Sequence, residues 1–192
     1  YPIELLTPAL AERQPTYIAR TYPTLGEPYR FSAEGALLRV STRPGYMPPA
    51  GLITASARFG DDLELLGSAS YAGAPEQGSV YAFSAYFRAL ADRLPDLQVS
   101  ARLWDGQGRQ VWQEDRSAFA LGMYPTSRWV KGEVVGDYFE IPLPDTLAPG
   151  RYRAGFIVYE RSGDAFVNRI VTDAAGSGGV VAYLPAFDVP LR

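Results

Sequence analysis

The amino-acid sequence predicts an all-β fold: an antiparallel two-sheet β-sandwich, Ig-like or jelly-roll-like, with a short N-terminal helix-plus-strand appendage. Three observations predict it. About seven to nine short segments alternate apolar and polar residues, as half-buried strands do. Turns that contain glycine or proline separate these segments at short intervals. The 192 residues are 47% hydrophobic, which is enough to fill a core between two facing sheets.

The N-terminal part is interpreted as a connecting segment. Apolar residues recur at helical spacing in residues 3–13, which indicates a short helix. Residues 16–22 and 36–42 are expected to form strands. The proline- and glycine-rich stretch 43–51 is the preferred boundary. The two predicted units are therefore the connecting segment, residues 1–50, and the β-sandwich domain, residues 51–192.

Four strands are expected in the first half of the sandwich. Residues 63–71 form one, in which Gly67 marks a bulge. Residues 80–90 and 97–104 alternate clearly, and their odd-numbered side chains are expected to face the core. A turn over residues 105–108 then leads into a return strand near residues 110–113.

Two further strands and a short tail are expected in the second half. Residues 137–143 place Phe139, Ile141 and Leu143 on one face, and residues 151–158 alternate in the same way after a Pro-Gly turn. Pairing of these two strands with each other is the simplest arrangement. The tail offers short strands at residues 166–172, 180–183 and 187–191.

Composition excludes several function classes. The chain contains no cysteine and no histidine, so it has no thiolate nucleophile, no cysteine zinc site and no imidazole base. Its net charge of −3 gives no basic footprint for nucleic acid. We therefore expect no nucleic-acid partner, and enzymatic activity is not expected from this sequence.

Two acidic clusters are candidate sites for a metal ion or a carboxylate pair. Asp61, Asp62 and Glu64 form one cluster, and Glu114 and Asp115 form the other. Carboxylates of this kind can bind calcium or act as an acid–base pair, but no Asp-x-Asp-x-Asp loop is present. Solvated residues at strand ends are the favoured interpretation. No catalytic residue, metal site or cofactor is therefore predicted, and a structural calcium ion is not predicted either.

An aromatic platform for sugar stacking is the main binding-site candidate. Sugar rings can stack on exposed aromatic rings through their apolar C–H side, while ordinary packing is the competing interpretation for these rings. The proposed platform consists of Trp104, Trp112, Tyr86, Tyr159, Arg88 and Arg102.

Four motifs, taken in order, resemble a known type of domain. They are FGDDLELLG from Phe59, LWDGQG from Leu103, YPTSRWVKGEVVGD from Tyr124 and PGRY from Pro149. This order looks like the extracytoplasmic C-terminal β-sandwich domain of bacterial multi-pass membrane glycosyltransferases, which are similar to the protein mannosyltransferase and aminoarabinose transferase group. The resemblance covers about residues 59–159.

The resemblance implies a role outside catalysis. Such enzymes transfer sugar from a polyprenyl-phosphate donor, using carboxylates in loops of their membrane part, and none of those loops is in this sequence. This fragment would be an accessory domain on the extracytoplasmic side of a bacterial cell membrane. Segments missing from the sequence would tether it, and its partners would be the transmembrane part of the parent protein and a glycan or glycolipid.

The motif residues themselves are expected to be structural. Trp129 is expected to plug the core, and Asp137 to sit at a strand entry or bond to a turn. The full set is Tyr124, Pro125, Trp129, Gly132, Asp137, Pro149, Gly150 and Tyr152. Two other functions stay open: an independent carbohydrate-binding module, and a structural or protein-interaction sandwich with no small ligand.

Overall fold

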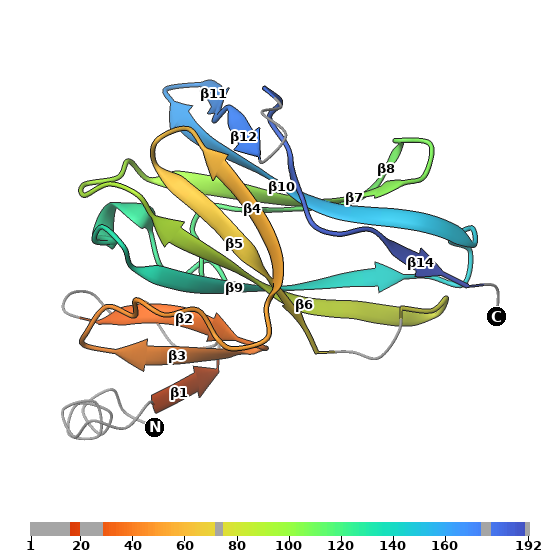
Figure 1. Cartoon of the computed structure of the whole chain (residues 1–192), viewed down its shortest axis with the longest axis horizontal. Coiled ribbons are helices and arrows are strands. Elements are labelled where there is room, and N and C mark those ends of the chain that lie inside the picture. Colours follow the sequence, from red (N-terminus) through yellow and green to blue (C-terminus); the bar gives the residue numbers. More distant parts are fainter. Residues whose placement is uncertain (1–15, 20–28, 72–74, 174–177, 191–192) are drawn as a thin grey trace.

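The computed structural model describes residues 16–19, 29–71, 75–173 and 178–190 (Figure 1). These residues contain fourteen strands and a short 3-10 helix, η2, but no α-helix and no helix long and apolar enough to cross a membrane. The strands are β1 (Thr16–Ala19), β2 (Arg30–Glu34), β3 (Leu37–Ser41), β4 (Ile53–Phe59), β5 (Leu63–Ser70), β6 (Ser79–Ala89), β7 (Leu97–Asp105), β8 (Gln110–Arg116), β9 (Val134–Leu143), β10 (Gly150–Ser162), β11 (Ala165–Asn168), β12 (Val171–Asp173), β13 (Ala182–Tyr183) and β14 (Phe187–Val189), and η2 spans Thr126–Arg128.

Two antiparallel sheets face each other, which confirms the predicted β-sandwich. The five-stranded sheet has the order β12-β4-β5-β6-β9. The six-stranded sheet has the order β11-β10-β7-β8, with β13 and β14 also paired to β10 (Figure 1). Phenylalanine rings fill the space between them: the ring centroid of Phe156 in β10 lies 5.4 Å from that of Phe139 in β9 and 5.4 Å from that of Phe87 in β6.

Strand alternation predicts correctly which side chains enter this core. In β7, Leu97, Val99, Ala101 and Leu103 are all buried, as expected for the odd positions. The predicted bulge at Gly67 is also confirmed, because the β5–β6 register shifts there. A Cβ atom at Gly67 would lie 2.3 Å from the Ile53 carbonyl oxygen, so this position requires glycine.

The expected pairing of the strands near residues 137–143 and 151–158 is wrong. β9 pairs with β6 in one sheet, whereas β10 pairs with β7 in the other. The alternation of side chains determines which face of a strand is buried, but it says nothing about which neighbour the strand selects.

A separate three-stranded sheet, in the order β1-β3-β2, lies beside the sandwich (Figure 1). Strands β1 and β3 fall within the predicted strands at residues 16–22 and 36–42, and β2 was not predicted. Phe31, Leu38 and Val40 belong to the same buried cluster as the sandwich core. The predicted helix at residues 3–13 lies outside the described residues, and the division at residue 50 stays a prediction.

Strand β2 lies against β9 at Gly136. The Gly136 amide donates to the Ser32 hydroxyl at 2.8 Å, and a Cβ atom on Gly136 would lie 2.5 Å from the Ala33 carbonyl oxygen. This close approach helps to cover one end of the five-stranded sheet. Tyr86 of β6, which lies opposite Gly136, is buried at this contact, although alternation predicts that it faces outward. Ser84, on the same face of β6, is also buried.

The loop between β8 and β9 carries four of the eight motif residues from the resemblance. Trp129 is 2% exposed and its ring packs against Phe119 at 5.2 Å and Tyr124 at 5.8 Å between centroids. Pro125 precedes η2, and Gly132 has φ of +85°, where glycine is favoured. Further along, Pro149 and Gly150 precede Tyr152 at the start of β10, and the Tyr152 hydroxyl donates to the Ala148 carbonyl at 2.5 Å.

Of the two roles expected for Asp137, the strand entry is wrong because the residue lies inside β9, whereas the bond to a turn is present, because its side chain contacts the turn residue Leu121. Its side chain is fully buried, and its Oδ1 atom lies 2.6 Å from Nη1 of Arg116 in β8. The same oxygen accepts a hydrogen bond from the Leu121 amide at 2.8 Å. Asp137 therefore joins the two sheets to the loop that holds Trp129.

Candidate functional site

The six residues of the predicted aromatic platform do not lie together. Tyr86 and Arg88 are in β6 of the five-stranded sheet. Tyr86 is 5% exposed, and Arg88 forms an ion pair with Glu64 in β5 at 3.2 Å. Neither side chain is therefore part of a platform on the six-stranded sheet.

The other four residues are in the six-stranded sheet but on different faces. Trp112 in β8 pairs with the inward residue Leu103 and packs against the core, so it faces inward. Trp104 and Arg102 in β7, and Tyr159 in β10, belong to the outward-facing rows of their strands. Three predicted residues thus share the outer face of this sheet.

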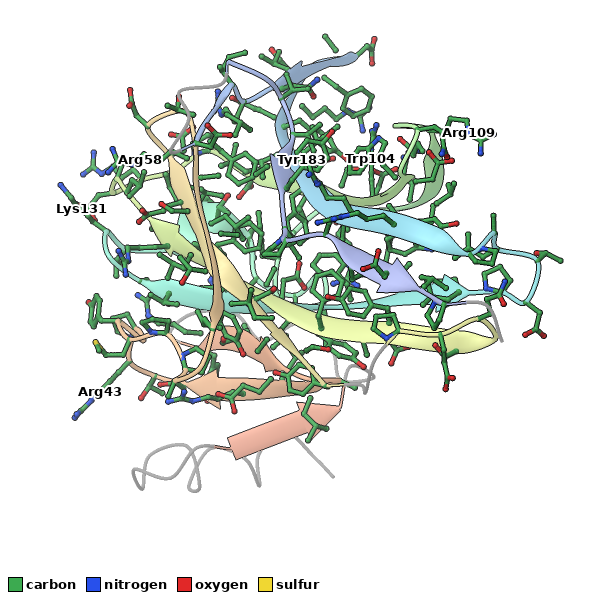
Figure 2. The ribbon with its side chains drawn as sticks, turned by 45° about the vertical axis from the view of Figure 1, so that its right-hand side comes forward. Arg43, Arg58, Trp104, Arg109, Lys131 and Tyr183 are labelled. Carbon is green, nitrogen blue, oxygen red and sulfur yellow. The ribbon has the colours of Figure 1, made fainter. Side chains whose placement is uncertain are left out.

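On that outer face, Trp104 meets an aromatic ring that sequence reasoning did not include. The ring of Tyr183 in β13 packs edge-on against Trp104, with centroids 5.2 Å apart and an interplanar angle of 69°. Figure 2 shows these two side chains next to each other. Tyr183 remains 43% exposed, so the pair is open to solvent.

Gly155 in β10 makes this contact between rings feasible. It lies between Arg102 of β7 and Tyr183 of β13 in the strand register. A Cβ atom at Gly155 would lie 3.1 Å from a Tyr183 ring carbon and 2.8 Å from the Ala182 carbonyl oxygen. The missing side chain lets Tyr183 reach across β10 toward Trp104.

Arg153 completes the aromatic group. It is directly opposite Trp104 in the β7–β10 register, and its guanidinium carbon lies 5.0 Å from the Tyr183 ring centroid. This is a cation–π contact, which orients the guanidinium group on the outer face. A hollow of about 260 Å³ adjoins these side chains. It is lined by Trp104, Asp105, Gly106, Gly108, Arg151, Tyr152, Arg153, Tyr183 and Ala186.

A row of hydrogen-bonded polar side chains extends from Arg102 across the same face. The Arg102 guanidinium donates to Ser100 at 2.9 Å and to Gln110 at 3.0 Å. The Gln110 amide donates to Gln113 at 2.9 Å, and Gln113 donates to Asp115. We call these five residues the polar row. Ser100 is buried, whereas the half-buried Arg102 and the exposed Gln110, Gln113 and Asp115 present planar donors and acceptors beside the aromatic pair.

Two titratable groups at the borders of this face have shifted pKa values. Burial raises the pKa of Tyr159, whose ring packs edge-on against Phe166 at 5.5 Å. Desolvation opposes ionisation of Asp105, but hydrogen bonds from Arg109 and Gln107 outweigh it and lower the Asp105 pKa. Asp105 is thus held as an ionised carboxylate, paired with Arg109 at 2.8 Å.

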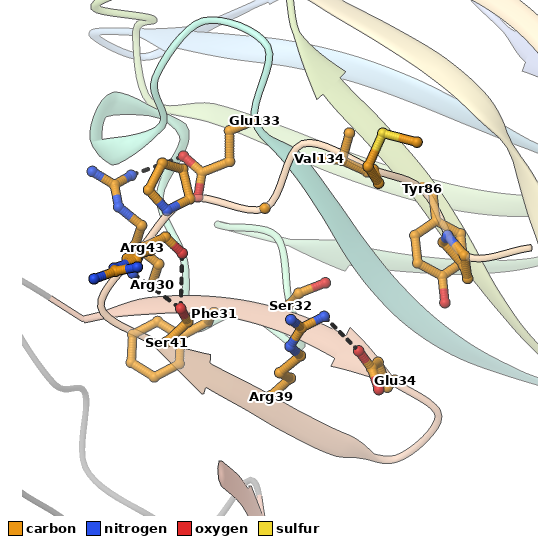
Figure 3. Close-up of a pocket in the computed structure, with 14 residues that line it drawn as sticks. Arg30, Phe31, Ser32, Glu34, Arg39, Ser41, Arg43, Tyr86, Glu133 and Val134 are labelled. Carbon is orange, nitrogen blue, oxygen red and sulfur yellow. Dashed lines mark hydrogen bonds and ion pairs between the residues drawn. The ribbon is translucent and has the colours of Figure 1, made fainter. Parts of the chain in front are cut away.

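A second hollow, of about 360 Å³, lies between the three-stranded sheet and β9 (Figure 3). Four of its five charged lining residues form ion pairs with one another. Arg30 donates to Glu133 at 2.8 Å and to the Tyr124 hydroxyl at 2.9 Å, and Arg39 pairs with Glu34 at 3.2 Å. Burial raises the pKa values of both Glu133 and Tyr124. The Arg30 contacts join the three-stranded sheet to the sandwich, and the Arg39–Glu34 pair links β3 to β2 within that sheet, so this larger hollow has a structural explanation.

Several acidic residues of the two clusters considered from sequence form ion pairs with arginines. Asp62 pairs with Arg169 at 2.8 Å, and Glu114 pairs with Arg116 at 2.7 Å. Among the residues that the structure describes, no group of three or more aspartate or glutamate side chains is arranged to hold a metal ion.

Comparison with known proteins finds solved structures with a similar fold, of which two are described here. No protein-family model and no curated protein matches the chain. The C-terminal domain of Wzt matches with a TM-score of 0.46 and 14% identity, over 79% of this chain and 90% of that one. A family 123 glycoside hydrolase from Clostridium perfringens, studied for hydrolysis of glycolipid glycans, matches with a TM-score of 0.37 and 9% identity, over 60% of this chain and 22% of that one. Because both TM-scores are below 0.5, neither likeness supports an argument about function.

Proposed function

We propose that this chain is a non-catalytic glycan-binding domain whose binding surface is the outer face of the six-stranded sheet. The observation that carries the proposal is the open Trp104–Tyr183 ring pair beside the polar row. A sugar ring offers an apolar C–H side and a rim of hydroxyl groups. The ring pair can stack against the apolar C–H side, and the polar row can form hydrogen bonds with the hydroxyl groups.

The shape of the surface supports binding of a chain rather than of an enclosed small molecule. The hollow of about 260 Å³ is smaller than the roughly 300–1,000 Å³ of typical small-molecule pockets. It is continuous with an open sheet face. We therefore expect one sugar unit to fill the hollow and neighbouring units to lie along the polar row.

The chemistry of the surface supports a binding role rather than catalysis. An acid catalyst needs a pKa raised toward neutral pH, yet the Asp105 pKa is lowered by its hydrogen bonds. Asp115, at the far end of the polar row, accepts a hydrogen bond from Gln113. Asp105 is therefore not tuned as a proton donor for glycoside cleavage, and the Asp115 carboxylate is engaged in the hydrogen bond to Gln113.

The setting that we propose follows the resemblance to C-terminal domains of bacterial membrane glycosyltransferases. In that setting the domain lies on the extracytoplasmic side of the membrane, bound to the transmembrane part of its parent, and holds a glycan or glycolipid acceptor. The gene of the parent protein tests this setting. Several apolar segments of about 20 residues would support it, whereas a signal peptide alone would favour an independent carbohydrate-binding module.

Calorimetric titration against a panel of oligosaccharides tests the glycan-binding function itself. Trp104→Ala should weaken binding at least about tenfold, which corresponds to about 1.4 kcal/mol. Tyr46→Ala is a matched control, because Tyr46 is a similarly exposed aromatic residue, 53% exposed, beside Gly132 on another part of the surface. The absence of binding to any glycan at millimolar concentration, or equal loss in both variants, would contradict the proposal.

A further inference from the structure

We infer that the glycan bound on the outer face carries an anionic group, a carboxylate or a phosphate, on the sugar unit that fills the hollow beside Trp104. This inference rests on the proposed function and adds a substrate class to it. Two arginine side chains, Arg151 and Arg153, line this hollow.

Arg151 and Arg153 are two residues apart in β10, so both side chains point to the outer face of the sheet. Both residues are exposed. Among the described residues, neither guanidinium group has a carboxylate within ion-pair distance, and the contact of Arg153 with Tyr183 is a cation–π contact. Two positive groups at one hollow are thus available for a ligand.

The carboxylates near the hollow do not cancel these charges. Asp105 lines the hollow, but it is paired with Arg109 and accepts two backbone hydrogen bonds through Oδ1. Asp188 in β14 is opposite Arg151 in the strand register and is exposed, yet the two side chains form no ion pair. The rim of the hollow therefore has an excess of positive charge, although the whole chain carries a net charge of −3.

The geometry of the two arginines suits an anionic group on a sugar. A guanidinium group binds carboxylate and phosphate oxygens through two parallel N–H donors, and it stacks on aromatic rings at the same time. The contact of Arg153 with Tyr183 places such a donor set next to the rings on which the sugar would stack. The sugar ring and its charged substituent can therefore be bound together at one place.

Titration with matched neutral and acidic ligands tests the inference. The probes are a trimer of galacturonic acid, its methyl ester, and a 6-phosphorylated mannose oligosaccharide with its unphosphorylated parent. We expect at least one anionic probe to bind about tenfold or more tightly than its neutral counterpart at low salt. The preference should shrink as salt is raised from about 0.01 to 0.3 M, because exposed charges are screened. The carboxylate and phosphate pairs show which anionic group is preferred.

Variants separate this inference from the proposed function. Arg151→Gln and Arg153→Gln should remove the preference for the anionic probe, so that its affinity falls to that of its neutral counterpart measured on the same variant. Arg58→Gln is the matched control, since Arg58 is an exposed arginine in β4 of the other sheet (Figure 2). Equal affinity for the members of both pairs would overturn the inference and leave the glycan-binding proposal intact. No binding of any probe would overturn both.

Discussion

The buried ion pair between Arg116 and Asp137 provides a sharp test of how the two sheets are held together. Arg116 is in β8 of one sheet and Asp137 in β9 of the other, with 2.6 Å between Nη1 and Oδ1. The two side chains are 6% and 0% exposed. Arg116 also donates to the Tyr138 carbonyl at 2.7 Å and lies 4.1 Å over the Phe139 ring.

Arg116→Met would leave the Asp137 carboxylate buried without an opposing charge. Removing one partner of a buried pair typically costs about 3–5 kcal/mol, and the lost bond to Tyr138 favours the upper part of that range. The measurement is the free energy of unfolding in urea at neutral pH. Arg39→Met is the control: its ion pair with Glu34 is 48% and 35% exposed, so solvent screening limits the loss to about 1 kcal/mol or less.

The pH dependence of the same variant gives a second, independent check. Burial raises the pKa of Asp137, and the opposing charge of Arg116 limits the rise, so Arg116→Met should raise it further. An acid whose folded-state pKa exceeds its unfolded-state pKa stabilises the fold at low pH, and this contribution is lost as pH rises. The penalty of Arg116→Met should therefore be smaller near the acidic end of the measurable range than at neutral pH. A penalty below about 1 kcal/mol, or one that does not vary with pH, would refute the burial of this carboxylate.

Three further predictions follow from other positions. Trp129→Ala should cost about 3–5 kcal/mol in urea unfolding, because it empties a fully packed site, and a loss under about 1 kcal/mol would contradict that packing. Glu133→Gln should gain stability relative to the natural protein as pH rises above 4.5, because burial raises the Glu133 pKa and the folded natural protein must then lose a proton that it holds more tightly than the unfolded chain does. Urea unfolding at several pH values measures this difference in the free energy of unfolding. The opposite trend would show that the Glu133 pKa is not raised. Gly155→Ala should cost about 1–3 kcal/mol of stability and weaken glycan binding, because the added methyl group displaces β13. Gly178→Ala is the control: no atom lies within 4 Å of its Cβ position, so stability and glycan binding should both stay unchanged. Urea unfolding measures the first quantity and calorimetric titration the second, and equal effects of the two substitutions would contradict the prediction.

The sequence predicts the sandwich well because each long strand buries one face. Alternation in β7 and β9 identifies the apolar core side chains correctly, and the bulge at Gly67 in β5 is also predicted. In β6 it identifies Phe83, Ala85 and Phe87 but not the burial of Ser84 and Tyr86 on the opposite face. It does not identify strand partners, so β9 and β10 were expected to pair although they belong to different sheets. Strand β2 escaped prediction because its five residues include the charged Arg30 and Glu34 and follow a proline-containing loop.

Only part of the candidate site could be predicted from the sequence. Trp104 and Arg102 are predicted to belong to the platform because they alternate with core residues in one strand, and the structure places both on the outer face of the sheet. Tyr183 was missed because it reaches this face through the pairing of a two-residue strand, which leaves almost no pattern in the sequence. Trp112 was misplaced because its orientation depends on the β7–β8 register, which contains an irregularity next to it.

The central claim, that the outer face around Trp104 binds glycan, is tested most directly by a nuclear magnetic resonance titration of the three tryptophan indole N–H signals. The ligand is whichever oligosaccharide binds most tightly in calorimetry. The account predicts that the Trp104 indole signal shifts most on saturation, together with backbone amides of β10 and β13, while the signal of the buried Trp129 stays in place. An unchanged Trp104 signal at saturation, with the largest shifts near Arg39 and Arg43 at the second hollow, would contradict it.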